Sequence, residues 1–261
     1  MPILYEHPLS PYAQKVKIAL REKGVGFESR LPEGIGTENT GGDFTRGNPR
    51  GEVPFLRDGD AAIFDSTIIL EYIEEKWPSP ALLPKDPAFR ARMRLIEDVM
   101  DTHYEAINWG LGEINHFERA DGELRAKIEE RAGKQIAGMH DWLERKLGER
   151  TWFTGDAFGW GDLSVIPHVN GSIGFGFEPA PGSALAAWRD RAMARESVAK
   201  TATEAVASIA GMQNVAAAVE AGLFKREYRD HRLEWMIKSG GLDVVVEGLE
   251  RDNIRFTPDF G

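Results

Sequence analysis

The sequence predicts an α/β region followed by an all-helical region, and three observations carry this prediction. Residues 1–78 alternate short apolar runs with helical patterns in the order β-α-β-loop-β-β-α, which is typical of a mixed four-stranded sheet with helices against it. Residues 78–87 are rich in proline and predict a linker. From residue 88 the apolar spacing becomes helical, which predicts a helical-bundle domain over 88–211 and an extension, 212–261, packed on it.

The first helix has a clear start signal at Ser10-Pro11. Serine is a preferred N-cap, and proline suits the first helical position because the N–H that it lacks is unpaired there anyway. Strands are predicted on either side of this helix, at residues 3–5 and 25–31. The apolar positions of the helix predict that its basic residues lie outside the apolar face: Lys15, Lys17 and Arg21. Residues 32–47 are glycine-rich, with room for at most one short helix.

Residues 48–67 predict a β-hairpin that leads into a helix. The turn residues 57–60, Arg-Asp-Gly-Asp, separate two apolar runs that end at Phe64. Pro54 has no N–H to donate, so we expect it at the start of the strand, and its peptide bond with Val53 is a candidate for the cis form. Asp65-Ser66 then opens a helix that extends to Trp77.

The helical region contains five predicted helices, at residues 88–112, 121–147, 162–169, 184–195 and 198–210. Met93, Ile96, Met100 and Tyr104 share one face of the first. The second carries many Glu, Arg and Lys residues, which predicts a solvated face. A basic and aromatic cluster at residues 225–232 is open to three interpretations, a lid, a partner surface or a solvated face, and the last is favoured.

Composition excludes several classes of function. The net charge of −10, without a basic stripe, argues against nucleic-acid binding. The chain has no cysteine, which excludes disulfides and a cysteine nucleophile. Its six histidines lack the spacing of metal ligands, so no metal is expected. Neither a signal peptide nor a membrane span is apparent, so we expect a cytoplasmic protein that does not bind membranes.

The hairpin and the helix after it predict a site for a small peptide. Before the strand, Val53 would turn its N–H and C=O outward, where an extended peptide could pair with them as an added strand. Ser66, at a helix N-terminus, would offer its hydroxyl and N–H groups to a carboxylate. The two features together predict a peptide ligand that carries an α-carboxylate.

These motifs resemble the cytosolic glutathione S-transferase superfamily, and more narrowly a serine-type bacterial member. The resemblance covers residues 1 to about 210. It rests on three segments: Asn48-Pro49-Arg50-Gly51-Glu52-Val53-Pro54, Asp65-Ser66, and Phe158-Gly159-Trp160-Gly161-Asp162, which is similar to the family's helix-capping element. The family fold is a thioredoxin-like domain followed by an all-helical domain, in agreement with the fold class predicted above.

By this resemblance the ligand is glutathione, γ-Glu-Cys-Gly, as a substrate. The family places the cysteinyl main chain against the residue before the cis-proline, here Val53, the γ-glutamyl carboxylate at Ser66 and the ammonium at Asp65. Glu52 and Pro54 complete the implied binding set. Ser10 matches the catalytic position, where its hydroxyl would donate a hydrogen bond to the glutathione sulfur and favour the thiolate, which is the nucleophile.

Each site residue also has a simpler interpretation. Ser10 could be only an N-cap. Tyr5 and Tyr12 are rival hydroxyl donors; Tyr5 is expected in the core. The resemblance also puts Pro11, Tyr12, His103 and Tyr104 at the pocket for the second substrate.

The sequence departs from the family pattern at two positions. Glu52 stands where many relatives carry glutamine, and its carboxylate could repel the glycyl carboxylate of glutathione unless Arg50 or another base offsets it. Gly159 stands where Ser or Thr usually caps the helix, so that cap depends on Asp162 or on main-chain groups.

The resulting functional hypothesis is a glutathione transferase that adds the glutathione thiolate to a small hydrophobic electrophile, a detoxification reaction. The alternative is a protein with the same fold that serves as a non-catalytic interaction module. A homodimer is implied by the family alone. The sequence does not identify the electrophile.

Overall fold

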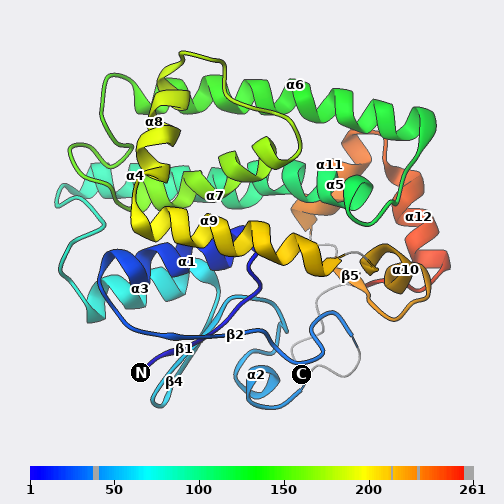
Figure 1. Cartoon of the computed structure of the whole chain (residues 1–261), viewed down its shortest axis with the longest axis horizontal. Helices are drawn as coiled ribbons and strands as arrows, with labels where there is room; N and C mark the ends of the chain where they lie inside the picture. Colours follow the sequence, from blue (N-terminus) through cyan, green and yellow to red (C-terminus); the bar gives the residue numbers. More distant parts are fainter. Residues whose placement is uncertain (38–40, 213, 228–229, 256–261) are drawn as a thin grey trace.

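The fold combines a small sheet with a large set of helices. A computed structural model describes residues 1–37, 41–212, 214–227 and 230–255. Figure 1 shows the strands gathered below and the long helices stacked above them, with α1 between the two layers. The α/β region consists of β1 (Ile3–Tyr5), α1 (Pro11–Glu22), β2 (Glu28–Arg30), α2 (Asp43–Gly47), β3 (Phe55–Asp58), β4 (Ala61–Phe64) and α3 (Ser66–Lys76).

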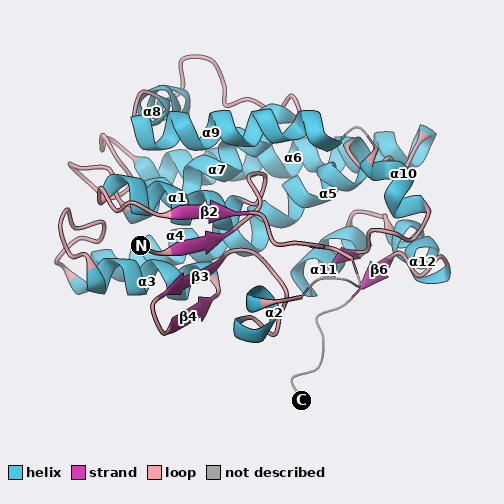
Figure 2. Ribbon diagram, turned by 60° about the horizontal axis from the view of Figure 1, so that its bottom comes forward, coloured by secondary structure: helices cyan, strands magenta, loops and turns pink. Residues whose placement is uncertain are grey.

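The sheet is mixed and four-stranded, as predicted. Its order is β2-β1-β3-β4, with β1 parallel to β2 and antiparallel to β3, and with β3 and β4 forming the hairpin (Figure 2). Leu4 lies opposite Leu56 at the centre, and both side chains are fully buried. The predicted strand at residues 25–31 is shorter than expected, because only Glu28–Arg30 pairs with the three residues of β1.

The helical region begins after the proline-rich segment. Its elements are α4 (Pro87–Val99), η1 (Met100–Tyr104), α5 (Glu105–Asn115), α6 (Gly122–Leu147), α7 (Trp160–Gly174), α8 (Ala184–Met193), α9 (Glu196–Ile209) and η2 (Ala210–Met212). The predicted helix at 162–169 is longer at both ends. It starts at Trp160 because the carboxylate of Asp162 accepts a hydrogen bond from the N–H of Gly159 at 3.1 Å and caps the first turn.

The long helix predicted at residues 88–112 is interrupted by a π-turn. Residues 100–104 form a π-helix, η1, between α4 and α5. Such a turn inserts one extra residue into an α-helix and is frequent at functional sites.

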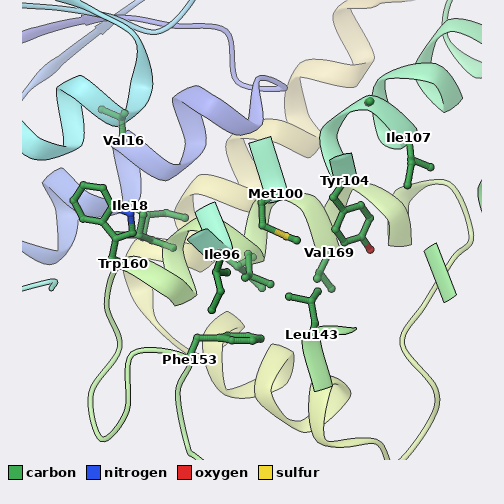
Figure 3. Close-up of a cluster of buried hydrophobic side chains, with 14 of the residues drawn as sticks. Val16, Ile18, Ile96, Met100, Tyr104, Ile107, Leu143, Phe153, Trp160 and Val169 are labelled. Atoms are coloured by element: carbon green, nitrogen blue, oxygen red, sulfur yellow. The ribbon is translucent and has the colours of Figure 1, made fainter. Parts of the chain in front are cut away.

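The main core joins α1 to the helical layer. Figure 3 shows Ile18 of α1 beside Trp160, with Ile96 and Met100 in the same group of side chains, all of them buried. These side chains belong to one hydrophobic cluster that extends from the sheet through α4 and α7. Burial of this kind, at roughly 25 cal/mol per Å² of apolar surface, is the main force that holds the two layers together.

The charged side of α1, which the sequence places outside the apolar set, is buried as well. Lys15 is fully buried, Lys17 is 2% exposed, and both are ion-paired. The reason is that α1 is packed on opposite sides, by α3 and by α7 and α9, so it has no solvated face over this length.

The extension contributes further elements after α9: α10 (Val215–Glu220), β5 (Arg226–Glu227), α11 (Asp230–Lys238), α12 (Leu242–Glu250) and β6 (Ile254–Arg255). β5 and β6 pair in parallel as a separate small sheet. Figures 1 and 2 place α11 beside α5, with which it is in contact. The extension also reaches the α/β region, since the N–H of Lys225 donates to the carbonyl of Gly36 at 2.8 Å.

Candidate functional site

A cleft lies between the α/β region and α4. Its volume is about 250 Å³. Six of the residues predicted for the site line it together: Tyr12, Glu52, Val53, Pro54, Asp65 and Ser66. The other lining residues are Asn48, Arg50, Phe64, Thr67, Arg94, Glu97, Asp98, Asp101 and Thr102. The cleft is therefore polar, with both carboxylates and guanidinium groups on its walls.

The main chain at Val53 forms one edge of the cleft. The Val53–Pro54 peptide bond is cis, as the sequence suggested. Among the hydrogen bonds of the described residues, none uses the N–H or C=O of Val53. Asn48 fixes the preceding residue by donating from Nδ2 to the Glu52 carbonyl at 2.5 Å. The edge is thus held in place while the polar groups of Val53 stay available to an extended peptide.

The N-terminus of α3 forms the end of the cleft beside that edge. Asp65 is the N-cap, and its Oδ1 accepts from the N–H of Thr67 at 3.0 Å. Its φ of 74° lies in the left-handed region, which is unusual for a residue with a side chain and recurs at binding sites. Arg50 pairs with the other carboxylate oxygen at 3.3 Å. Ser66 is 5% exposed and stands at the first helical position, where N–H groups favour an anion.

The wall opposite is supplied by α4 and the start of η1, through residues other than the predicted His103 and Tyr104. The polar residues at positions 94, 97, 98, 101 and 102 of the chain repeat at helical spacing, and this stripe was the available signal. Glu97 is 1% exposed and joins three elements. It accepts hydrogen bonds from Lys15 of α1 at 2.5 Å, Thr67 of α3 at 2.9 Å and Trp160 of α7 at 2.5 Å.

Asp101 is the second carboxylate that Lys15 holds at this wall. Although burial acts to raise the pKa of Asp101, the ammonium of Lys15 and the imidazole of His168 together outweigh it and hold that pKa below its usual value. Burial acts to lower the pKa of Lys15, but Asp101 and Glu97 outweigh it and raise that pKa. The ammonium of Lys15 and the carboxylate of Asp101 therefore stay charged near neutral pH, and their ion pair holds η1 against α1.

Ser10 is the N-cap of α1, as predicted. Its Oγ accepts a hydrogen bond from the N–H of Ala13 at 3.3 Å, and the residue is half-buried. Within the described residues, no hydrogen bond uses its O–H as a donor. Ser10 and Pro11 do not line the cleft, whereas Tyr12, the second residue of the helix, does. The Tyr12 hydroxyl donates to the Asp101 carbonyl at 2.8 Å, so its proton is already used.

Tyr104 does not face the cleft, and the expectation that it does is wrong. It is fully buried, its hydroxyl contacts His140 at 2.8 Å and Ser172 at 2.9 Å, and burial raises its pKa. Figure 3 shows it beside Met100 and Val169, on the apolar face that its spacing indicates. His103 is exposed and contacts Thr102, but it does not line the cleft either. Tyr5 packs on Phe44 and Phe55 in the core, as expected.

The basic cluster at residues 225–232 is not a solvated face. Arg226 and Arg232 have side chains only 17% and 11% exposed, and they pair with Glu113 at 2.6 Å and Glu105 at 2.7 Å. Tyr228 and Arg229 of this cluster lie outside the described residues. The favoured interpretation is therefore wrong for the two arginines, because α5 offers them buried carboxylates.

Comparison with known proteins identifies the family. A sequence profile of the glutathione S-transferase N-terminal domain matches residues 4–81. Glutathione S-transferase 1 of Dianthus caryophyllus is 33% identical over 68% of this chain and 80% of its own length. Glutathione S-transferase U28 of Arabidopsis thaliana is 32% identical over 75% of this chain and 85% of its own. The chain belongs to the glutathione S-transferase family.

Structures of other glutathione S-transferases share the fold. A glutathione S-transferase of Rhodospirillum rubrum is 27% identical, with a TM-score of 0.68 over 77% of this chain and 91% of the other. Rice GST1 in complex with glutathione is 26% identical, with a TM-score of 0.68 over 83% and 97%. The family also includes a maleylacetoacetate isomerase of Pseudomonas aeruginosa, 32% identical over 71% of this chain and 85% of its own length.

The described residues contain neither a cluster of metal-ligating side chains nor a membrane-spanning helix. No group of three or more His, Cys, Asp or Glu side chains is placed to hold a metal ion in that part of the chain. None of its described helices is long and apolar enough to cross a membrane.

Proposed function

We propose that the chain is a glutathione transferase that conjugates the glutathione thiolate to a small hydrophobic electrophile. The observation that carries this proposal is the cleft itself, in which the free main-chain edge at Val53 and the N-terminus of α3 at Ser66 lie on one surface. An extended tripeptide would pair its cysteinyl main chain with Val53 and place its γ-glutamyl carboxylate at Ser66. Asp65, shared with Arg50, would meet the ammonium group.

Ser10 is the proposed catalytic residue. Among the described residues no hydrogen bond uses its O–H as a donor. It stands at the N-terminus of α1, whose partial positive charge would favour a thiolate by roughly 0.3–2 kcal/mol. A hydrogen bond to a charged sulfur would add about 1.5–3 kcal/mol. Tyr12, whose hydroxyl donates to the Asp101 carbonyl, is proposed only as a wall of the second-substrate pocket, to which Pro11 and His103 are also assigned.

The test is binding to immobilised glutathione followed by an aryl-halide conjugation assay. Ser10→Ala should bind glutathione but lose about 10- to 100-fold in rate, and the ultraviolet absorbance of the bound thiolate should titrate at a higher pH. Ser183→Ala is the matched control, because Ser183 caps α8 in the same way, accepting from Ala186 at 3.1 Å. Full activity in Ser10→Ala, or no retention of the unaltered chain, would contradict the proposal.

We propose that residues 1–78 bind glutathione, that 88–211 supply the second-substrate wall, that 212–261 pack on the helical domain, and that the protein acts in the cytoplasm.

A homodimer is part of the same proposal. Ile68 of α3 and Leu95 of α4 are 56% and 52% exposed, next to an ion pair of Glu71 with Arg94. Leu95→Glu should halve the mass found by sedimentation, whereas Val206→Glu, at a 69% exposed site of α9, should not.

A further inference from the structure

The turn that leads into α1 carries Ser10 at its end. Residues 7–10 form this turn, in which the N–H of Ser10 donates to the carbonyl of His7 at 2.8 Å. A bond between the first and the fourth residue is the one that closes a β-turn. We call residues 7–10 the serine turn. Because the backbone of this turn determines where the Ser10 hydroxyl lies, the groups that hold the turn also place that hydroxyl.

The side chain of His7 makes a second bond across the serine turn. Its Nδ1 accepts a hydrogen bond from the N–H of Leu9 at 3.2 Å. Pro8, between them, has no N–H to place. His7 therefore accepts from both N–H groups that follow it in the turn, from Leu9 with its ring and from Ser10 with its carbonyl. An N–H that is withdrawn from water is costly without an acceptor, so the ring is part of what keeps the turn closed.

The serine turn is also tied to the first turn of α1. Gln14, which is 9% exposed, donates from Nε2 to the carbonyl of Pro8 at 2.9 Å. Its main-chain N–H donates to the carbonyl of Ser10 at 2.9 Å, and the N–H of Ala13 donates to the Ser10 Oγ at 3.3 Å. The turn is therefore held to the helix by α1 and held closed within itself by His7.

The bond from Leu9 requires the neutral form of His7. A ring nitrogen accepts a hydrogen bond only when it carries no proton, so the proton of the neutral ring is on Nε2. Burial lowers the pKa of His7. The charge of Glu6 acts against this change, and those of Arg226 and Lys17 act with it. The ring therefore stays neutral at neutral pH, whereas in acid a proton on Nδ1 would oppose one donor to another.

The exact position of Ser10 matters because the residue stands back from the cleft wall. Ser10 is half-buried and does not line the cleft. Hydrogen bonds weaken steeply as the donor angle falls, and a misplacement of about 1 Å can cost about 100-fold in rate. A small shift of the serine turn would therefore reduce the bond from the Ser10 hydroxyl to a sulfur in the cleft.

We propose that His7 is a positioning residue for the glutathione thiolate, which keeps the Ser10 hydroxyl in place through the bond that its neutral ring accepts from Leu9. This inference rests on the proposed function, since it concerns the same hydroxyl and the same sulfur. His7 acts through Ser10, and it does not line the cleft itself.

The experiment compares His7→Ala with His7→Asn in the full chain, by aryl-halide conjugation and by ultraviolet titration of the bound thiolate. His7→Ala should lower kcat about threefold to tenfold and move the thiolate titration to higher pH. The Kd of glutathione should change less than about twofold, because Val53 and Ser66 are untouched. His7→Asn should recover kcat to within about twofold, because an asparagine oxygen can accept from the N–H two residues on.

The pH profile separates this role from a structural one. In the unaltered chain, kcat should fall more steeply below about pH 6 than the uptake of one proton allows, because the sulfur and the His7 ring are both protonated there. His7→Asn has no ring to titrate, so its profile should follow the uptake of one proton. This comparison holds even where His7→Ala does not fold.

His116→Ala is the matched control. His116 is also partly buried, its pKa is lowered by burial and by Arg226, and its ring packs on Phe175 at the end of α5. Its replacement should leave kcat and the pH profile unchanged. An unchanged kcat in His7→Ala, an equal loss in His7→Asn, an equal loss in His116→Ala, or a one-proton profile in the unaltered chain would overturn the inference. Full activity in Ser10→Ala, or failure of the unaltered chain to bind glutathione, would instead overturn the proposed function.

Discussion

Helices α1 and α6 have similar sequence patterns and opposite environments. Both combine an apolar stripe with several basic residues. On α6 the charges are solvated, as the sequence predicts, and Lys134 is 70% exposed beside Glu130. On α1, Lys15 is fully buried between Glu97 and Asp101. Charge on a helix therefore does not by itself indicate a solvated face.

The difference arises from what packs against each helix. Every basic side chain of α1 that the sequence places outside the apolar face meets a carboxylate from another element. Lys15 meets α4 and the π-turn, Lys17 meets Glu6 at 2.8 Å and Glu204 at 2.6 Å, and Arg21 meets Glu204 at 2.6 Å. The junction between the α/β region and the helices is thus partly ionic, and its pairs can be tested one at a time.

The largest effect is expected for Lys15→Met. It keeps the side-chain volume but leaves two carboxylates without their cation, so the free energy of unfolding should fall by about 3–5 kcal/mol. Denaturant-induced unfolding followed by circular dichroism measures this. A loss below about 1 kcal/mol would mean that water or a rotamer change stabilises the two carboxylates once the ammonium is gone. Lys15 would then contribute no more to stability than an exposed lysine of α6.

Acid should reduce the difference in free energy of unfolding between the unaltered chain and Lys15→Met. Because Lys15 holds the pKa of Asp101 below its usual value of about 3.9, the stability that this carboxylate contributes is present above that pH and is lost as the pH falls through the lowered pKa. The gap in unfolding free energy between the unaltered chain and Lys15→Met should therefore narrow between pH 5 and pH 3. A constant gap over this range would show that packing, and not charge, sets the effect.

Lys17→Met should have a smaller effect than Lys15→Met. One of its partners, Glu6, is 4% exposed, but the other, Glu204, is 32% exposed and can be hydrated when the ammonium is removed. We expect a loss of about 2 kcal/mol. Unfolding measured under the same conditions gives the order of the two variants, and a loss as large as that of Lys15→Met would contradict the dependence on burial.

The smallest effect is expected on α6. Lys134→Met removes an exposed i,i+4 pair with Glu130, so the free energy of unfolding should change by no more than about 0.5 kcal/mol. Added salt should reduce even this change, since exposed pairs are screened. A change above about 1 kcal/mol would indicate that α6 has packing partners beyond those of the single chain, for example in an oligomer.

Much of the fold was accessible from the sequence because the signals are local. The cap at Ser10, the turn at Arg57–Asp60 and the cis bond before Pro54 depend on neighbouring residues, and all are present. The half of the cleft formed by Val53 and Ser66 follows from the same local motif.

What the sequence did not reveal depends on contacts between distant segments. Lys15 is buried against Glu97, 82 positions later in the chain, and Arg232 pairs with Glu105, 127 positions earlier. The α4 wall likewise faces other segments, since Glu97 bonds Thr67, 30 positions earlier. Tyr104 is a different case. Its spacing along the helix predicted the apolar face, where it lies, whereas the family resemblance predicted the second-substrate pocket.

The π-turn at residues 100–104 determines the angular position of everything that follows on the same helix. An α-helix advances by about 100° per residue, so a shortening of this turn by one residue would rotate α5 through roughly that angle. Glu105 and Trp109 would then point away from Arg232, which pairs with Glu105, and from Arg226, which lies over the Trp109 ring. The one extra residue of the π-turn therefore sets the rotation of α5, and with it the helix face against which α11 packs.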